Sequence, residues 1–203
     1  MPRTEMEPAA RERLLDAMLV ELGTSGYNEM NVADALVLSA VSEAGFKAEF
    51  IDKDTCLFAA YERLTDRLVE KTVEACAAGD EWPEQVRRGL EALLGELAAQ
   101  PLMARVAIRA FPSIGPDAYA RYQAVIESFA LLLREGRRFS PIDGELPTEV
   151  EMLAVGAAEA IVFDEVEAGR AAQLPALGPA ILFSVLVPFL GPEAASAEMQ
   201  RAT

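Results

Sequence analysis

The feature that most constrains this fold is a helical spacing of apolar residues along nearly the whole chain. Leucines and methionines recur three and four positions apart between Leu14 and Leu22, and similar stripes follow in later segments. This spacing is the pattern of amphipathic helices that bury one face. No segment shows the apolar-polar alternation that is typical of strands. The sequence therefore predicts an all-α protein of about nine helices. The expected helices cover residues 8–24, 31–38, 42–49, 53–78, 82–99, 102–111, 117–136, 148–169 and 175–190.

Residues that favour helix N-termini mark several of these boundaries. The expected N-caps are Asn31, Ser42 and Asp52, because a short polar side chain before a helix can accept a hydrogen bond from a free amide. Thr148 and Glu151 have the spacing of a capping box, in which two residues satisfy amides reciprocally. The eighth helix is therefore expected to start at this pair.

Two segments are expected to be irregular. Residues 137–147 contain Pro, Gly and several charges, which predicts a mobile loop. Residues 192–203 follow the last apolar stripe and are mostly small or polar, so we expect a frayed tail.

Composition excludes several classes of function. The 203 residues include no histidine, so the chain has neither a histidine general base nor a histidine ligand for zinc. Acidic pairs such as Asp164 and Glu165 lie within an expected helix, where a solvated face is the simpler interpretation. We therefore expect no enzyme activity, no catalytic residues, no cofactor and no metal site. The formal net charge of −15 has the wrong sign for a protein that coats nucleic acid nonspecifically.

Several features predict a cytoplasmic chain without a membrane segment. The first residues, MPRTEMEPAARER, alternate in charge and lack the apolar region of a signal peptide. The longest apolar run, Ile181 to Leu190, is shorter than the roughly 20 residues that a membrane helix needs. Cys56 and Cys76 lie on one expected helix, roughly 30 Å apart, so they cannot pair with each other and are expected to be reduced.

The N-terminal block has the most specific pattern. Residues 11–64 contain a helix and then two short helices joined by a tight turn at residues 39–41, which is the layout of a helix-turn-helix. This segment resembles the DNA-binding region of the TetR (tetracycline-repressor-like) regulators, and the later helices follow the same family's order by pattern only. The matching landmarks are Leu14, Leu15, Gly26, Tyr27, Val32, Ala33, Asp34, Val41, Ser42, Phe46, Phe50, Asp52, Lys53 and Asp54.

The resemblance implies a division of the chain and a function. A helix-turn-helix DNA-binding domain would cover residues 1–52, and a ligand-binding and dimerisation domain would cover residues 53–203. The helices over 148–169 and 175–190 would pair with those of a second copy in a homodimer. The expected function is a ligand-responsive transcriptional regulator, a repressor that a small apolar effector releases from a double-stranded DNA operator.

The candidate DNA-binding residues lie in and beside the second short helix. They are Ser42, Glu43, Gly45, Phe46, Lys47 and Lys53. Lys47 and Lys53 are the expected phosphate partners, and Lys53 stands at a helix N-terminus, where amides also attract phosphate. Glu43 offers an acceptor that fits a cytosine amine in the major groove. Glu43 can also be a solvated acid that the helix dipole favours, and Lys53 can be an ordinary surface lysine.

Some residues depart from the TetR pattern. Ala40 occupies a turn position that usually holds glycine, and Val37 and Leu38 stand where charged residues are usual. Residues 1–50 contain four Lys and Arg against nine Asp and Glu, and carboxylates beside the DNA backbone repel it. The alternative function is a homodimer of the same fold that has lost operator binding and acts as a ligand-binding or protein-interaction module.

Side chains of the middle helices are the candidate ligand contacts. They are Met103, Phe111, Tyr119, Tyr122 and Phe129, with Trp82 as a further candidate. Ligand sites between helices are apolar with few polar groups, although an aromatic stripe on a helix is also the pattern of core packing. The last expected helix is apolar around its circumference, which predicts that a partner chain covers the side that includes Val185.

Overall fold

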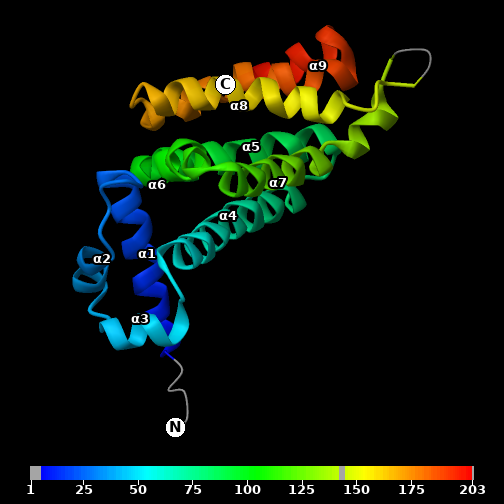
Figure 1. Cartoon of the computed structure of the whole chain (residues 1–203). Coiled ribbons are helices and arrows are strands. Elements are labelled where there is room, and N and C mark those ends of the chain that lie inside the picture. Colours follow the sequence, from blue (N-terminus) through cyan, green and yellow to red (C-terminus); the bar gives the residue numbers. More distant parts are fainter. Residues whose placement is uncertain (1–5, 142–144, 203) are drawn as a thin grey trace.

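The computed structural model describes residues 6–141 and 145–202, which form two helical lobes (Figure 1). The small lobe contains α1 (Pro8–Ser25), α2 (Val32–Ser39) and α3 (Glu43–Glu49). The large lobe contains α4 (Lys53–Ala77), α5 (Trp82–Ala99), α6 (Pro101–Arg105), α7 (Pro116–Leu132), α8 (Val150–Glu167) and α9 (Leu174–Arg201). No strand occurs among the described residues. The predicted all-α class and the predicted order of helices are confirmed.

Side-chain caps set the start of three helices. Asn31, Ser42 and Asp52 each accept a hydrogen bond from a backbone amide in the first turn of α2, α3 and α4, over 3.0, 3.1 and 2.8 Å respectively. These bonds satisfy amides that have no partner within the helix. Gly26 follows the last residue of α1 as its C-cap, and its φ of 78° costs little without a Cβ. The predicted caps are confirmed.

The turn between α2 and α3 is left-handed at Ala40. Its φ is 55° and its ψ is 35°, and no other non-glycine residue in the described part of the chain has a positive φ. The amide of Val41 donates to the carbonyl of Leu36 over 3.1 Å, which closes the end of α2. Because a Cβ in this conformation costs about 1–2 kcal/mol, the turn stores strain that glycine would not.

The two lobes have separate cores, but the core of the small lobe extends beyond residue 52. Leu14 and Leu15 of α1 are fully buried together with Leu57 and Tyr61 of α4 and with Phe111 after α6. The core of the large lobe gathers apolar side chains of α5, α8 and α9. The first half of α4 therefore belongs to both lobes, and Figure 1 shows it running from the small lobe along the large one.

The helix predicted over residues 102–111 is regular only in its first half. After α6 the chain forms a π-helical turn, Val106–Ala110, in which the amide of Phe111 donates to the carbonyl of Val106 over 3.0 Å. This turn holds one residue more than an α-helical turn would. Such insertions are rare and often occur at functional sites.

The predicted capping box at Thr148 and Glu151 is wrong. α8 begins at Val150, Glu149 is its N-cap residue, and no side chain caps the helix. The Glu151 carboxylate instead accepts hydrogen bonds from the Arg137 guanidinium, one of them over 2.7 Å. Glu151 pairs with Arg137 in preference to a backbone amide at the start of α8, because a charge-assisted pair with two hydrogen bonds is the stronger interaction.

The predicted loop over residues 137–147 is partly helical and is tied at its base. A 3-10 turn, Arg134–Phe139, takes its first residues and ends α7 earlier than predicted. Arg137 also donates to the carbonyls of Leu146 and Pro147, over 3.1 and 2.9 Å. The prediction of mobility concerns a loop whose centre, residues 142–144, lies outside the described part of the chain.

The predicted frayed tail is wrong as well. α9 continues to Arg201, with a break at Gly191, where φ is 76° and ψ is 167°. Ala195 after the break is fully buried and packs in the core of the large lobe. By length and composition, α9 could cross a membrane, but 39% of its most apolar stretch is already buried inside the chain. Its packing against α5 and α8 supports a core helix.

Candidate DNA-binding face and ligand cavity

Three of the candidate DNA-binding residues have structural roles within the small lobe. The Ser42 hydroxyl is bonded to the amide of Gly45. Phe46 is buried, 7% exposed, and its ring centroid lies 5.8 Å from that of Phe50. The structure thus brings these residues together as the cap and the core contact that hold α3 in place.

The cations that the structure describes in and beside the small lobe are bonded within the chain. Lys47 pairs with Glu43 on the exposed side of α3, and this hydrogen bond lowers the pKa of the Glu43 carboxyl. Lys53 donates to the carbonyl of Tyr27 over 3.0 Å and lies 3.9 Å from the centroid of its ring. Two further pairings are Arg11 with Glu49, over 2.8 Å, and Arg13 with the carbonyl of Ser39, over 3.1 Å. DNA would have to compete with these internal partners.

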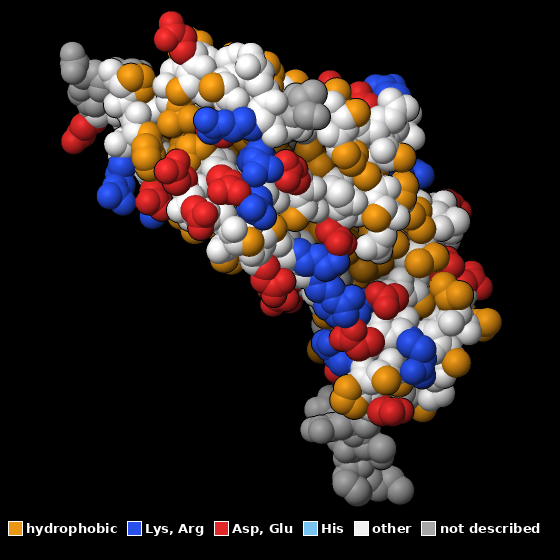
Figure 2. All heavy atoms as spheres, turned by 180° about the vertical axis from the view of Figure 1, so that it is seen from behind, with side chains coloured by type: hydrophobic (Ala, Val, Ile, Leu, Met, Phe, Trp, Pro, Cys, Tyr) orange, Lys and Arg blue, Asp and Glu red, His pale blue; other side chains and the backbone are white. Residues whose placement is uncertain are grey.

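The surface of the molecule has no continuous basic face in the view of Figure 2, where Lys and Arg side chains lie beside Asp and Glu side chains. The small lobe instead exposes large apolar residues. Val37 and Leu38 on α2 are 82% and 59% exposed, and Ile51 before α4 is 92% exposed. The apolar residues that the sequence places on α2, Val37 and Leu38, therefore lie on the surface and are not buried against α1.

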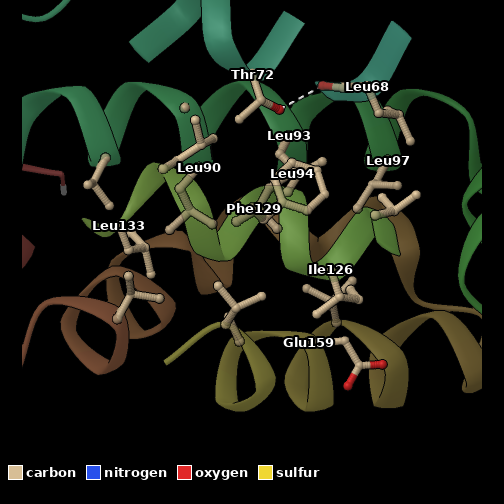
Figure 3. A pocket seen from close by; sticks show the side chains of 18 of the residues that line it. Leu68, Thr72, Leu90, Leu93, Leu94, Leu97, Ile126, Phe129, Leu133 and Glu159 are labelled. Carbon is tan, nitrogen blue, oxygen red and sulfur yellow. Dashed lines mark hydrogen bonds between the residues drawn. The ribbon is translucent and has the colours of Figure 1, made fainter. Parts of the chain in front are cut away.

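The large lobe contains a partly open cavity of about 240 Å³, which is lined by residues of α4, α5, α7, α8 and α9. Leucines of α4 and α5 line one side, and Ile126 and Phe129 of α7 line the other (Figure 3). The lining labelled in Figure 3 is Leu68, Thr72, Leu90, Leu93, Leu94, Leu97, Ile126, Phe129, Leu133 and Glu159. A concave site with a largely apolar lining is the usual form of a small-molecule site.

Most hydroxyl groups around the cavity are bonded to the protein itself. The Thr72 hydroxyl donates to the carbonyl of Leu68 over 2.7 Å, as Figure 3 shows. The hydroxyls of Thr65 and Tyr61 donate to the carbonyls of Tyr61 and Ala107, over 3.0 and 3.2 Å. Because these donors are already used, the hydroxyl groups can offer a ligand only the lone pairs of their oxygen atoms.

Glu159 is the one charged residue among the described residues that line the cavity. It accepts a hydrogen bond from the Tyr122 hydroxyl. Burial, and then this bond, raise the pKa of Tyr122 well above its usual value. Both residues also line an outer hollow with Tyr119 and Arg109, so the pair lies between the cavity and this hollow.

Trp82 lies in the cavity wall at the start of α5 and is 3% exposed. Its indole nitrogen, Nε1, is buried and has no hydrogen-bond partner among the described residues. The ring is stacked on Phe139, with centroids 5.6 Å apart, and Phe189 meets it edge-on. A Cβ on Gly136 would lie 2.4 Å from the ring, so glycine is needed for this close approach.

The predicted ligand contacts divide into three groups. Tyr122 and Phe129 line the cavity, and Tyr119 lines only the outer hollow and is 54% exposed. Met103 and Phe111 pack in the core of the small lobe. The lining leucines and Glu159 were missed by sequence reasoning. A lone carboxylate in the small and apolar run GAAEAIVF was the available signal for Glu159.

The cavity and the small lobe share structural elements. Tyr61 of α4 lines the cavity, stacks on Phe111 at 3.7 Å between centroids, and is bonded to the π-helical turn through Ala107. Val106 of the same turn is fully buried in the core of the small lobe. Directly packed residues therefore connect the cavity wall with the core that contains α1.

The outer faces of α8 and α9 are apolar and not covered by this chain. Leu153 on α8 is 67% exposed and Phe163 is 36% exposed. Ala176 and Ala180 on α9 are exposed, and Phe183 and Val187 continue their stripe half-buried. The predicted interface position of Val185 is wrong, because its side chain is 5% exposed in the single chain and lines the cavity.

No protein-family model matches the sequence, and no curated protein matches it. Solved structures do match the fold. FadR from Bacillus halodurans, a fatty acid degradation regulator, is 18% identical over 86% of this chain and 97% of its own, with a TM-score of 0.76. FadR from Bacillus subtilis, solved with stearoyl-CoA, is 15% identical over 88% and 97%, with a TM-score of 0.75.

A TetR-like transcriptional regulator from Rhodococcus sp. RHA1 is 22% identical over 92% of this chain and 99% of its own, with a TM-score of 0.66. The match extends over both lobes in each case, since nearly the whole chain is covered. The resemblance inferred from the small lobe thus agrees with the three-dimensional comparison. The fold of this chain is that of the TetR-family transcriptional regulators.

Proposed function

We propose that this protein is a ligand-responsive transcriptional regulator, a cytoplasmic repressor that a small apolar effector releases from double-stranded DNA. The observation that carries the proposal is the apolar cavity that shares Tyr61 and the π-helical turn with the helix-turn-helix lobe. A ligand that binds one arrangement of this shared wall better than another would shift the small lobe by mass action. Residues 1–52 are proposed as the DNA-binding unit, and residues 53–203 as the ligand-binding and dimerisation unit.

The DNA-binding part is tested by enrichment of genomic fragments at low salt, followed by salt titration on the best site. If Lys47 contacts a phosphate, Lys47→Ala weakens binding across sequences and lowers the salt slope by about one unit. Lys71→Ala is the matched control, because Lys71 is also exposed and paired with a glutamate but lies in the second half of α4. If the salt slope of DNA binding is the same for both variants, Lys47 does not contact a phosphate.

A specific observation favours the second function, a ligand-binding or protein-interaction module without an operator. Arg11, Arg13, Lys47 and Lys53 all have partners within the chain, and large apolar residues are exposed beside them. Phosphate contacts supply most of the nonspecific affinity for DNA. A lobe whose lysines and arginines are already bonded within the chain should therefore bind DNA weakly. If no genomic fragment is enriched even at low ionic strength, this second function replaces the first.

A homodimer through α8 and α9 is part of the proposal. The uncovered face that includes Leu153 and Phe163 is apolar, and such faces mark protein interfaces. Leu153→Glu should give monomers in sedimentation without unfolding the chain, since this side chain is exposed before assembly. Leu131→Glu on α7, where Leu131 is 54% exposed, should leave the dimer intact. A dimer that survives the Leu153 change contradicts this interface.

The effector part rests on the cavity and on one comparison. The FadR from Bacillus subtilis was solved with stearoyl-CoA, and a ligand with a long apolar chain in a protein of this fold supports an apolar effector here. Tyr122 and Phe129 are the proposed contacts in the cavity, and Tyr119 is a proposed contact at the outer hollow. A true effector at 100 times its Kd should stabilise the fold by about 2.7 kcal/mol and should release bound DNA.

A further inference from the structure

Glu159 lies on α8 between the side chains that line the cavity and those that line the outer hollow. Val155 and Val162, four positions before it and three after it, line the cavity. Gly156 and Phe163, three before it and four after it, line the hollow. Positions three and four apart share a face of a helix, so Glu159 belongs to both lining stripes. In Figure 3 its carboxylate lies at the α8 edge of the cavity and points away from the leucines.

The Glu159 carboxylate has no cationic partner among the described residues. One of its oxygens, Oε1, accepts the hydrogen bond from the Tyr122 hydroxyl, and the described part of the chain supplies this side chain with no second hydrogen bond or ion pair. Arg109 also lines the hollow, but its guanidinium is paired with Glu167. Because a carboxylate has about four lone-pair sites, most of the acceptor capacity of this half-buried group is unused.

We propose that the effector is an amphiphilic monocation, with an apolar chain in the cavity and a protonated amine on the hollow side of Glu159. This inference rests on the proposed apolar effector site and specifies the charged end of its ligand. An N–H of the ammonium group donates to the Glu159 carboxylate, and such a charge-assisted hydrogen bond is stronger than a neutral one.

The surroundings of Glu159 favour a cation over an anion. Tyr119 and Tyr122 line the hollow with ring centroids 6.3 Å apart, and the face of a tyrosine ring attracts a cation. An anion would need hydrogen-bond donors, but the Thr65 and Thr72 hydroxyls have already donated to backbone carbonyls. The formal net charge of −15 also attracts cations to the protein and repels anions.

The cavity and the hollow suit the two ends of such a molecule. At about 30 Å³ for each water-sized group, the cavity of about 240 Å³ has room for about eight of them, which corresponds to a chain of about eight carbons. The ammonium group stays at the boundary with the hollow and keeps part of its hydration there. Its transfer from water therefore costs less than full burial of a charge would.

Three probes with the same eight-carbon alkyl chain test the charged end. Octylammonium has a positive head group, octan-1-ol has a neutral one and nonanoate has a negative one. Calorimetric titration of the full-length protein at neutral pH gives the affinity of each. We expect octylammonium to bind at least tenfold more tightly than nonanoate, because the carboxylate of nonanoate would meet that of Glu159.

Glu159→Gln removes the negative charge and keeps the shape of the side chain. We expect it to lower the ratio of octylammonium affinity to octan-1-ol affinity by about tenfold, the effect of losing one hydrogen bond between charged groups. Glu127→Gln is the matched control, because Glu127 is an exposed residue of α7 that lines neither the cavity nor the hollow. It makes the same change in net charge and should leave the ratio unchanged.

The orientation of octylammonium in the unchanged protein tests the inference even if Glu159→Gln does not fold. Tyr119 lines the hollow and not the cavity, whereas Phe129 lines the cavity and not the hollow. Nuclear Overhauser effects should therefore connect the CH₂ beside the nitrogen with the Tyr119 ring, and the terminal methyl group with the Phe129 ring. The reverse pattern overturns the inference.

The affinities separate the inference from the proposed function. If octan-1-ol binds but the octylammonium ratio survives Glu159→Gln, or falls equally in Glu127→Gln, the cationic ligand is overturned and the apolar effector site stands. Nonanoate binding as tightly as octylammonium also overturns it. If neither octan-1-ol nor octylammonium binds at millimolar concentration, both the inference and the proposed apolar effector fail.

Discussion

Both lobes contain leucine-rich helices, but these helices fill a core in the small lobe and line a cavity in the large lobe. In the small lobe, Leu14 and Leu15 of α1 are fully buried and contact side chains on every side. In the large lobe, Leu90 and Leu93 of α5 remain half-buried because they face a cavity of about 240 Å³. Apolar periodicity thus specifies which face of a helix turns inward. The surrounding helices determine whether that face packs against other side chains or lines a cavity.

The largest expected effect tests this difference with one substitution made in both lobes. Leu15→Ala should lower the free energy of unfolding by about 3–5 kcal/mol, because it opens a new void in a filled core. Leu93→Ala should cost about half as much or less, because it only enlarges a space that already exists. Chemical denaturation of both variants measures the contrast, and equal losses would mean that the cavity wall is as tightly packed as the small lobe.

An intermediate effect compares ion pairs in the two lobes. Glu151→Gln should cost about 1–3 kcal/mol, because Glu151 is 6% exposed and holds Arg137 with two hydrogen bonds. Glu49→Gln breaks the Arg11 pair, which is exposed, and should cost about 0.2–1 kcal/mol. A loss for Glu49→Gln that matches the Glu151 loss would show that the pair on the small lobe is far more rigid than its exposure suggests.

The Glu151 contribution should also depend on pH. The hydrogen bonds from Arg137 hold the pKa of Glu151 below its ordinary value of 4.5, so the folded state binds the proton more weakly than the unfolded state. The stabilisation is therefore present above about pH 4.5 and is lost as the pH falls through the lowered folded pKa. Denaturation of the unchanged protein and of Glu151→Gln from pH 7 to pH 3 should converge at the acid end.

The smallest effect compares one backbone position in each lobe. Ala40→Gly should raise the free energy of unfolding by about 0.5–1 kcal/mol, because it relieves the left-handed turn between α2 and α3. Ala120→Gly on the exposed side of α7 should lower it by about 1 kcal/mol, since Ala120 has ordinary helical neighbours. Destabilisation by both changes would show that the packing of α2 on α1 fully relaxes the turn.

Local features of the fold were predictable from the sequence because their partners lie within a few residues. Asn31, Ser42 and Asp52 bond to amides two or three positions away, so their spacing alone identified three helix starts. Glu151 has an equally suitable spacing from Thr148, but its partner Arg137 is 14 positions away. A pattern of nearby residues does not reveal a charged pair between distant positions, and for this reason the prediction of a capping box was wrong.

The cavity was only partly predictable for a related reason. Phe111 and Phe129 are both aromatic residues of the middle helices, yet Phe111 stacks on Tyr61 in a filled core and Phe129 faces open volume. The sequence places both on inward faces and cannot distinguish them. The tail after Gly191 was misjudged because small residues such as Ala195 are compatible with either solvent or a tight helix contact.

The π-helical turn is a point at which the helix could lose one residue and keep its hydrogen bonds, although the packing beyond it would change. Because Val106–Ala110 contains one surplus residue, deleting a residue there would restore a regular helix with its hydrogen bonds intact. Everything between the deletion and the break before α7 would then rotate by about 100° about the helix axis. Phe111 would turn away from Tyr61, and the cavity and the small lobe would lose the packed wall that they now hold in common.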